Sequence, residues 1–328
     1  MKKITIKDIA REANVSPSTV SRVVNKSAPV SRELEERVLE IIGNYGYSPD
    51  AVARSLRRGF ADTVAFVVPD ITNPFFSLII KGAEDFFKKY NISLIVCGSN
   101  HSAKEEERIL DNLLSKKVDG LLFIGAGNES LELHELLSEF KIVFVDRAYS
   151  DIDSPYVVSN NYEGMKEVVK YLVQTGHKSF VLLNGEKGTY SATERLKGFV
   201  DTLNEFGIDS YETYFGQFTY ECGVELVNQL KDIPDAIVCG NDLIAYGAID
   251  ALEERGITVP EQVSVTGFDD LPFSKHYKPS LTTVKQPFYD MGYESAKILW
   301  LMINGKVVKR KRVVLDTKLI VRDSAKVR

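Results

Sequence analysis

The sequence has 328 residues, which is too long for one ordinary hydrophobic core and suits two or three domains. Its composition, 44% apolar and 27% charged, is that of a folded globular protein and excludes a disordered chain. No stretch approaches the roughly 18 consecutive apolar residues of a membrane span, and the first residues lack the pattern of a signal peptide. We therefore expect a cytoplasmic protein that makes no contact with a membrane.

The charge is unevenly distributed along the chain. The net charge is −5, yet residues 1–60 carry 11 Lys and Arg against 7 Asp and Glu, a net of +4. Residues 61–328 carry 30 against 39, a net of −9. A basic N-terminal region on an acidic remainder indicates that only the N-terminal region meets a polyanion, although chance clustering is the simpler alternative.

The residue types that bind metals or form disulfides are scattered. The three cysteines form no close pair and the four histidines have no metal-ligand spacing; they are Cys97, Cys222, Cys239, His101, His134, His177 and His276. No Ser/His/Asp set is apparent either. The sequence thus predicts no metal, no cofactor, no disulfide framework and no catalytic residues.

Three short helices are predicted in the first 47 residues. Thr5 and Asp8 form a capping signature before a first helix, whose apolar residues recur at helical spacing at Ile6, Ile9, Ala10 and Ala13. Ser16 is a suitable cap for a second helix, and Pro17 suits its first position because the missing N–H costs nothing there. A third helix is predicted from about Ser31 to a stop at Gly46, with an inward face of Val38, Ile41, Ile42 and Tyr45.

The link between the first two helices is only three residues, as in a helix-turn-helix. Val20, Val23 and Val24 of the second helix should face the core, leaving outward Ser18, Ser21, Arg22 and Asn25. A small, hydroxyl-rich face can enter the major groove of DNA, and Arg22 could bind guanine through two hydrogen bonds. The alternative is an ordinary solvated face.

The stretch YSPDAVARSLRRG, residues 47–59, predicts a further short helix that begins at Ser48 and Pro49. At about nine residues it would not persist alone in water. Its arginines could meet phosphates, and Leu56 could act as an apolar wedge in the minor groove. A simple linker is the alternative.

From residue 62 apolar runs alternate with amphipathic stretches, which predicts an α/β architecture with buried parallel strands. A break near residues 159–162 divides the strands into two sheets. The predicted strands are 63–69, 92–98, 118–125, 141–146, 179–185, 235–241 and 262–269. Polar residues and aromatic rings follow several strand ends, where such sheets bind ligands, and they suit a neutral, hydroxyl-rich ligand. Helix caps at Asn73 and Asn241 and a surface ion pair at Asp146 and Arg147 are the alternatives.

The motifs TIKDIAREANVSPSTVSRVVN and YSPDAVARSL resemble the head and hinge helix of the LacI/GalR family of bacterial transcription regulators. The resemblance implies a homodimer on a palindromic duplex DNA operator, with paired hinge helices that insert the leucine matching Leu56. Pro17, Ser18 and Arg22 match the base-reading positions. The full set of expected DNA contacts is Thr5, Ser16, Pro17, Ser18, Ser21, Arg22, Asn25, Ala53 and Leu56.

The remainder resembles type I periplasmic sugar-binding proteins, which are relatives of this family's effector domains. The motifs TNPFF, VDR, ATERLKGF, GQF, GND, GFD and VKQP are most similar to the ribose-binding branch. The resemblance implies ligand contacts at Asn73, Phe75, Phe76, Asp146, Arg147, Arg195, Phe218, Asn241, Asp269 and Gln286. The expected fold is a small all-α helix-turn-helix head followed by an α/β, two-lobed, type I body with parallel sheets.

We therefore expect a helix-turn-helix domain over 1–47, a hinge over 48–60 and an effector and dimerisation domain over 61–328. Lobe one should comprise about 61–160 and 289–321, and lobe two about 161–288. The expected function is a repressor of sugar-utilisation genes that responds to ribose, and the absence of leucine heptads favours a dimer over a tetramer. Another sugar, a purine corepressor or a phosphorylated carrier protein remains open as the effector. A dinucleotide enzyme would need more than the partial motif GAGNES at 125–130, and a transport-binding protein would not explain the N-terminal helices.

Overall fold

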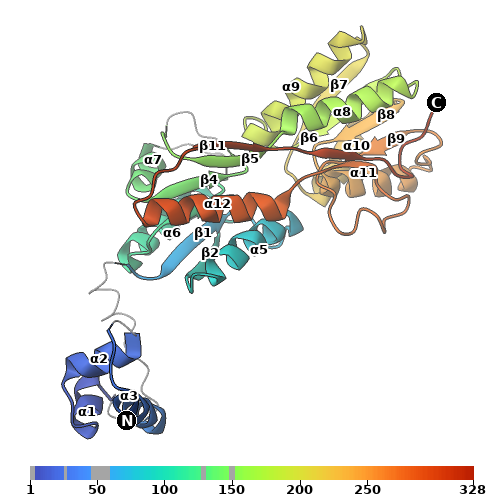
Figure 1. Ribbon diagram of the computed structural model, residues 1–328. Helices are drawn as coiled ribbons and strands as arrows, with labels where there is room; N and C mark the ends of the chain where they lie inside the picture. Colours follow the sequence, from blue (N-terminus) through green and yellow to red (C-terminus); the bar gives the residue numbers. More distant parts are fainter. Residues whose placement is uncertain (1–3, 26–27, 46–59, 127–130, 148–151) are drawn as a thin grey trace. The chain divides into compact units, whose positions relative to one another are not determined.

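The computed structural model describes residues 4–25, 28–45, 60–126, 131–147 and 152–328. The chain divides into two compact units, Met1–Ala61 and Asp62–Arg328, which we call the head and the body (Figure 1). The hinge positions Ala53 and Leu56 and the predicted helix end at Gly46 lie outside the described residues.

The head consists of three helices around a small apolar core. They are α1 (Ile6–Glu12), α2 (Pro17–Asn25) and α3 (Arg32–Tyr45). Ile9, Val20 and Val38, one from each helix, are at most 1% exposed. This shared core stabilises helices that are too short to persist separately. The predicted helix-turn-helix is confirmed.

The turn between α1 and α2 is tight. Asn14 adopts the left-handed conformation with φ of 52°, and the Val15 amide donates to the Ala10 carbonyl at 2.9 Å. One prediction for the head is wrong: Tyr45, placed inward by its spacing, is 47% exposed. It is the last residue of α3 and does not reach the core that Ile41 and Ile42 contact.

Lobe one of the body is a six-stranded parallel sheet with the strand order β11-β5-β4-β3-β1-β2. Val64 and Phe66 of β1 face a cluster shared with α5, whereas Ala65 and Val67 face a cluster shared with α6. Helices cover both faces, which explains why the strands read as continuous apolar runs. The elements are β1 (Thr63–Val68), α5 (Pro74–Lys88), β2 (Ser93–Gly98), α6 (Ala103–Lys116), β3 (Leu121–Phe123), α7 (Leu131–Ser138), β4 (Ile142–Val145), β5 (Tyr156–Ser159), α12 (Phe288–Ile303) and β11 (Arg312–Leu315).

Lobe two is a four-stranded parallel sheet with the order β7-β6-β8-β9. Phe180 and Leu182 of β6 pack with α8 and α9, and Val181 and Leu183 pack on the other face with α10 and α11. The elements are α8 (Asn161–Gln174), β6 (Phe180–Asn184), α9 (Tyr190–Glu205), β7 (Tyr211–Phe215), α10 (Tyr220–Gln229), β8 (Ala236–Cys239), α11 (Asp242–Glu254) and β9 (Ser264–Thr266).

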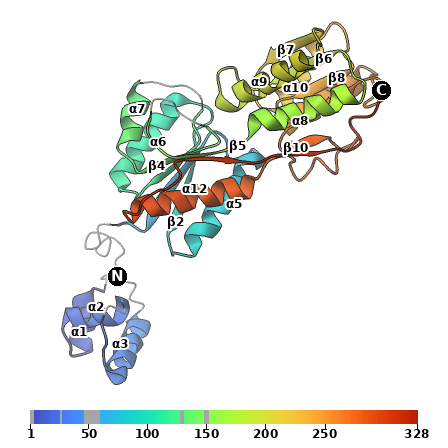
Figure 2. The same ribbon diagram turned by 45° about the horizontal axis from the view of Figure 1, so that its top comes forward.

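Three segments cross between the lobes (Figure 2). They follow β5, precede α12 and join β11 to β12. The strands β10 (Thr283–Lys285) and β12 (Lys318–Ile320) pair in an antiparallel sheet of their own. The C-terminal residues then pack on lobe two, where the Arg328 amide donates to the Thr175 carbonyl at 2.8 Å. β12 thus finds its hydrogen-bond partner in β10 and not in the lobe-one sheet.

None of the helices in the described part of the chain is both long and apolar enough to span a bilayer. The α/β body and the helical head agree with the predicted fold class.

Candidate functional site

The outward face of α2 carries small polar side chains. The Thr19 amide donates to Ser16 Oγ at 3.1 Å, and the Ser16 and Ser18 hydroxyls are 2.7 Å apart, so Ser16 caps the helix as predicted. Pro17, Ser18 and Arg22 are exposed and Ser21 is half-buried. The surface that the sequence assigns to DNA is therefore accessible on the head. The side chain of Asn25 lies outside the described part.

Thr5 holds the start of α1. Its hydroxyl and its amide both donate to Asp8 Oδ2, at 2.6 and 3.0 Å, which is the predicted capping interaction. Thr5 itself is exposed at the first turn.

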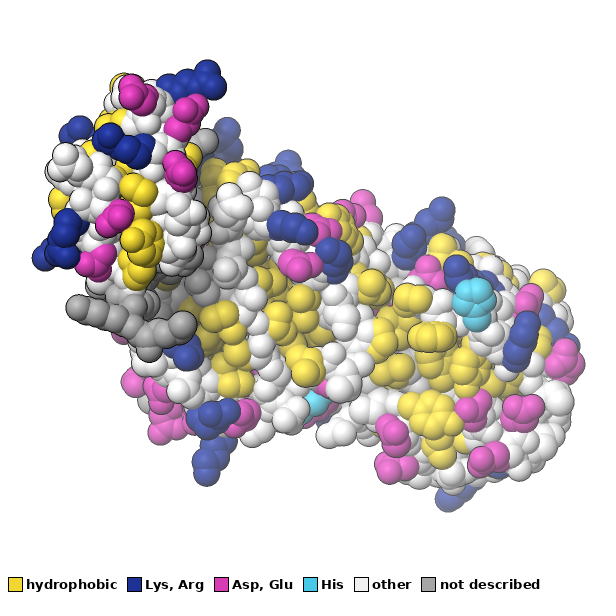
Figure 3. Space-filling model, turned by 90° about the horizontal axis from the view of Figure 1, so that it is seen from below, with side chains coloured by type: hydrophobic (Ala, Val, Ile, Leu, Met, Phe, Trp, Pro, Cys, Tyr) yellow, Lys and Arg dark blue, Asp and Glu magenta, His cyan; other side chains and the backbone are white. Residues whose placement is uncertain are grey.

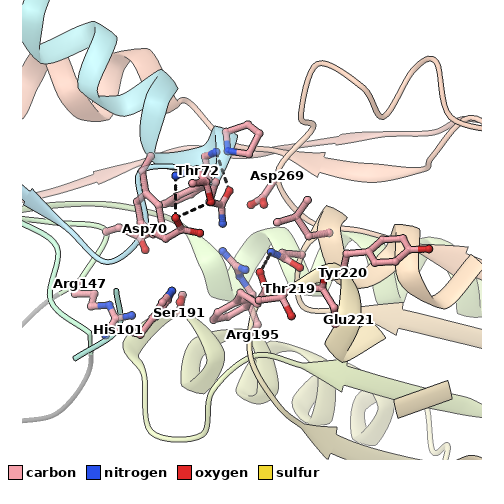
Figure 4. A pocket seen from close by; sticks show the side chains of 18 residues that line it. Asp70, Thr72, His101, Arg147, Ser191, Arg195, Thr219, Tyr220, Glu221 and Asp269 are labelled. Atoms are coloured by element: carbon pink, nitrogen blue, oxygen red, sulfur yellow. Dashed lines mark hydrogen bonds between the residues drawn. The ribbon is translucent and has the colours of Figure 1, made fainter. Parts of the chain in front are cut away.

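A cavity of about 260 Å³ lies between the two lobes, at the carboxyl ends of their strands (Figure 4). Asp70, His101 and Arg147 lie on one side of it in Figure 4, and Asp269, Thr219 and Glu221 on the other. Nine of the ten predicted ligand residues line it: Asn73, Phe75, Phe76, Asp146, Arg147, Arg195, Phe218, Asn241 and Asp269.

The apolar part of the lobe-one wall begins at Asn73, directly before α5. The Asn73 side chain accepts a hydrogen bond from the Phe75 amide at 3.0 Å, with Pro74 in the first helical position. Asn73 is thus a helix cap and a cavity residue at once. The rings of Phe75 and Phe76 meet edge to face, with centroids 5.0 Å apart, and form a rigid apolar surface.

Asp146 and Arg147 follow β4 and form the polar part of the same wall. They are only 6% and 8% exposed, so the alternative of a surface ion pair is wrong. Asp146 Oδ1 and Arg147 Nε and Nη1 are buried without a hydrogen-bond partner among the described residues. Burial raises the pKa of Asp146 to about 6, although the Arg195 and Arg147 charges oppose this. A ligand that donates to Asp146 and accepts from Arg147 would remove a cost of about 1–3 kcal/mol for each unpaired group.

Arg195 of α9 forms the floor of the cavity on lobe two. Its Nε donates to Asn161 Oδ1 at 2.8 Å and its Nη1 donates to the Gly240 carbonyl. The guanidinium also lies over the Phe268 ring, 3.9 Å from the centroid, and 5.6 Å from the centroid of Phe218. Arg195 is therefore held in place before any ligand arrives.

The other polar groups of lobe two are also engaged. Asn241 caps α11 by accepting from the Ile244 amide at 2.9 Å, and its amide nitrogen lies 3.3 Å from the Phe218 carbonyl. Asp269 accepts from Gln286 Nε2 at 2.6 Å. Burial and the neighbouring Asp242 carboxylate raise the pKa of Asp269 well above its usual range.

Gln286 does not line the cavity, contrary to its predicted role as a ligand contact. It is 1% exposed and lies behind Asp269, where its Oε1 accepts from the Ser159 hydroxyl. Asn161 Nδ2 in turn donates to the Ser159 carbonyl at 3.1 Å. A continuous series of hydrogen bonds thus links Arg195 to Asp269 through two of the crossover segments. We call these five hydrogen-bonded residues the hinge series: Arg195, Asn161, Ser159, Gln286 and Asp269.

Several cavity residues were not predicted. Asp70, Thr72 and His101 follow β1 and β2, so the rule that placed Asn73 could have found them. Thr219, Tyr220 and Glu221 follow β7, a strand that the apolar pattern did not reveal because its side chains are half-buried. Among the described residues no group of three or more His, Cys, Asp or Glu is placed to hold a metal ion. The arrangement can bind a small polar molecule between two lobes.

Comparison with known proteins decides the family. Residues 61–322 match the family described as periplasmic binding proteins and sugar binding domain of LacI family. Residues 5–50 match bacterial regulatory proteins of the lacI family. The chain belongs to the LacI family. It is therefore a DNA-binding regulator with a ligand-binding domain, as the sequence motifs predicted.

Individual relatives and solved structures support the assignment. The HTH-type transcriptional repressor PurR of Pasteurella multocida is 33% identical over 331 residues, covering 99% of both chains. A lac repressor dimer, solved on its operator with the anti-inducer ONPF, is 26% identical and covers 98% of this chain and 99% of its own, with a TM-score of 0.89. A LacI-family regulator of Enterococcus faecium, solved with bound ribose, is 27% identical and covers 81% of this chain and 99% of its own, with a TM-score of 0.74.

Proposed function

We propose that this LacI-family protein is a cytoplasmic repressor of sugar-utilisation genes whose affinity for a palindromic operator is controlled by ribose. It acts by binding, not by catalysis. The observation that carries the proposal is the set of unpaired polar atoms of Asp146 and Arg147 in the cavity wall. They require a ligand with hydrogen-bond donors and acceptors close together, as on adjacent hydroxyls of a sugar.

The rest of the cavity also suits a neutral sugar. Carboxylates of Asp146 and Asp269 accept from hydroxyls, guanidinium groups donate to ring and hydroxyl oxygens, and the Phe75 and Phe76 rings offer an apolar surface to C–H groups. The ribose-bound relative supports ribose among the sugars. A purine corepressor is the competing ligand class, and a phosphorylated carrier protein would act elsewhere on the surface.

We further propose that the protein acts as a homodimer. β2 is an outer strand of the lobe-one sheet, and its apolar residues are incompletely covered, with Val96 40% exposed. Figure 3 views the body from the side of α5 and β2 and shows hydrophobic side chains gathered there between charged ones. A second copy would cover this surface, as free apolar edges favour association. The lac repressor relative is a dimer.

The hinge series suggests how a ligand could act on DNA binding. A sugar that bridges Asp146 and Arg147 of lobe one to Arg195 of lobe two would close the lobes about the crossover segments. Closure would shift the first lobes against each other across the dimer and favour release of the hinge segments around Leu56. The effect on operator affinity equals the difference in sugar affinity between the two states.

On DNA, we propose that α2 enters the major groove through Pro17, Ser18 and Arg22, with Thr5, Ser16, Ser21 and Asn25 beside them. Ala53 and Leu56 of the hinge would meet the minor groove. We assign the head to 1–47, the hinge to 48–60 and the effector domain to 61–328.

The test selects duplexes from a randomised library with full-length protein at moderate salt. We expect recovery of a palindrome, weaker binding when ribose is added, and loss of sequence preference with Arg22→Gln. Leu56→Ala should weaken operator binding and leave sugar binding intact. Equal affinity for every duplex, with and without sugars, would contradict the proposed function.

A further inference from the structure

One edge of lobe one is basic although the body as a whole carries a net charge of −9, from 30 basic and 39 acidic residues. All six strands of lobe one run in the same direction, so the segments leading into them lie at one edge, opposite the cavity. In their described residues these segments carry ten Lys and Arg against four Asp and Glu. We call them the basic rim: residues 60–62, 88–92, 116–120, 139–141, 152–155 and 304–312.

The corresponding edge of lobe two has the opposite charge. The segments 175–179, 205–210, 229–235 and 254–263 carry three Lys and Arg against six Asp and Glu. Both lobes are parallel sheets with helices that end at this edge. The fold alone therefore does not produce a basic edge.

Helix dipoles explain only part of the basic rim. Lysines at the ends of α5 and α6 complement the negative carboxyl end of each helix. In lobe two, however, α9 and α11 end on Glu205 and Glu254. The largest basic group, the stretch KVVKRKR at 306–312, lies beyond the end of α12, where the helix dipole has faded.

The stretch 306–312 presents its charges to solvent. All five of its basic side chains are exposed. Lys311 forms an ion pair with Asp153 at 2.8 Å, but Asp153 is 89% exposed and such a pair contributes little. No carboxylate in the described residues lies within ion-pair distance of Lys309 or Arg310. These charges are available to a polyanion.

The position of the basic rim points to DNA as that polyanion. β1 begins at Thr63, so the connection to the basic head enters the body at this edge. Figures 1 and 2 show the end of α12 at the same end of lobe one as the start of the body. Exposed cations at this edge can bind phosphates of the same duplex, and phosphate contacts position a protein without reading sequence.

We propose that the basic rim binds the phosphate backbone of the duplex that flanks the operator. This rests on the proposed function of the head, and it gives the acidic body a direct part in DNA affinity. Each phosphate neutralised should add about 0.9 to the slope of log affinity against log salt.

The test compares full-length wild type with Lys309→Gln/Arg310→Gln. The matched control is Lys178→Gln/Lys231→Gln, which removes two exposed lysines from the corresponding edge of lobe two. Affinity is measured over a salt series on the operator alone and on an operator extended by a helical turn, about 10 base pairs, on each side. Wild type and control should bind the extended duplex several-fold more tightly, and the rim variant should lose that gain and one to two units of slope.

Equal slopes for wild type and rim variant on both duplexes, with the operator still bound, would overturn the proposal and leave the proposed function standing. That result is also expected if the rim docks an acidic protein. Equal losses of salt slope and of affinity for the extended duplex in the rim and control variants would overturn it as well, because they would show a general charge effect. If wild type prefers no palindrome but the rim variant still loses slope on random duplex, the basic rim stands and the proposed function fails. Unchanged thermal unfolding verifies that both variants fold.

Discussion

The two walls of the cavity differ in how their polar groups are satisfied. On lobe two, Arg195, Asn241 and Asp269 all have hydrogen-bond partners within the protein. On lobe one, Asp146 and Arg147 are also buried but keep three polar atoms unpaired among the described residues. The polar groups of the lobe-two wall are paired within the protein, whereas the lobe-one wall keeps unpaired groups that a ligand can satisfy.

This difference predicts that the lobe-two residues contribute mainly to stability and the lobe-one residues mainly to ligand binding. Arg195 and Asp269 take part in the hinge series and Asn241 caps α11, so these lobe-two residues contribute to the fold and to the connection between the lobes. The lobe-one residues cost folding free energy in the empty protein, since buried polar groups without partners are unfavourable. A ligand recovers that cost, which favours binding over the empty state. Substitutions on the two walls should therefore have different consequences.

The largest effect is expected for Arg195→Leu. It would leave Asn161 Oδ1 and the Gly240 carbonyl without these partners and would remove the positive charge that opposes the raised pKa of Asp269. We expect the free energy of unfolding to fall by about 2–4 kcal/mol and sugar binding to be lost. Chemical denaturation and calorimetry measure the two quantities. If the free energy of unfolding did not fall, the paired residues of the lobe-two wall would not contribute to stability, contrary to the prediction.

Arg147→Leu should affect ligand binding more than stability. Sugar affinity should fall about 30-fold, equivalent to about 2 kcal/mol, because charge-assisted hydrogen bonds to the ligand are lost. Any loss in the free energy of unfolding of the empty protein should be smaller than for Arg195→Leu, since Arg147 Nε and Nη1 have no hydrogen-bond partners to lose and only its charge acts on Asp146. A loss of stability as large as that of Arg195→Leu would contradict the proposed difference between the two walls.

Asp146→Asn should stabilise the empty protein in a pH-dependent manner. The pKa of Asp146 is raised in the folded state from the ordinary value of 3.8 to about 6. The stability that Asp146 gains from its raised pKa is thus fully present below about pH 4 and is lost as the pH rises through 6. We expect variant and wild type to be most similar near pH 4 and the variant to gain about 1–3 kcal/mol relative to wild type by pH 7.5. Unfolding at a series of pH values tests this, and a difference independent of pH would contradict it.

The smallest effect is expected at His177 in lobe two, where the dependence of stability on pH has the opposite sign to that of Asp146. Its ring nitrogens lie 2.8 Å from the Leu172 carbonyl and from Ser264 Oγ, and burial lowers its pKa. The contribution of His177 is therefore present above its ordinary pKa of 6.5 and is lost as the pH falls below it. His177→Gln should cost about 1 kcal/mol at pH 7.5 and less at pH 5.5. A cost that grows as the pH falls would contradict the assignment.

The sequence predicts the fold best where the pattern is set by burial on both faces. The seven strands predicted from apolar runs are all present, although shorter at their ends. β5, β7 and β10 escaped prediction. β5 and β10 are only four and three residues long, and β7 is a half-exposed outer strand that lacks a continuous apolar run. Nine of the ten predicted ligand contacts line the cavity, and Gln286 differs because its side chain is hydrogen-bonded to Ser159 and Asp269.

Some of the cavity residues show which structural roles a sequence cannot distinguish. The sequence left Asn73 and Asn241 open between helix cap and ligand contact. Each caps a helix and also lines the cavity, because helices begin where parallel strands end. The sequence also gave no sign that Asp146 and Arg147 are unpaired, since pairing depends on distances between lobes and loops. The charge of the basic rim was hidden in the average of the body, because it is assembled from segments far apart along the chain.

The central claim is that the lobe-one wall is completed by a sugar, and calorimetric titration tests it most directly. Ribose, other pentoses, hexoses and purine bases would be titrated into wild type and into Arg147→Leu. The account predicts saturable heat for ribose with wild type and a markedly weaker response with the variant. No saturable binding of any neutral monosaccharide, or equal affinity in both proteins, would contradict it.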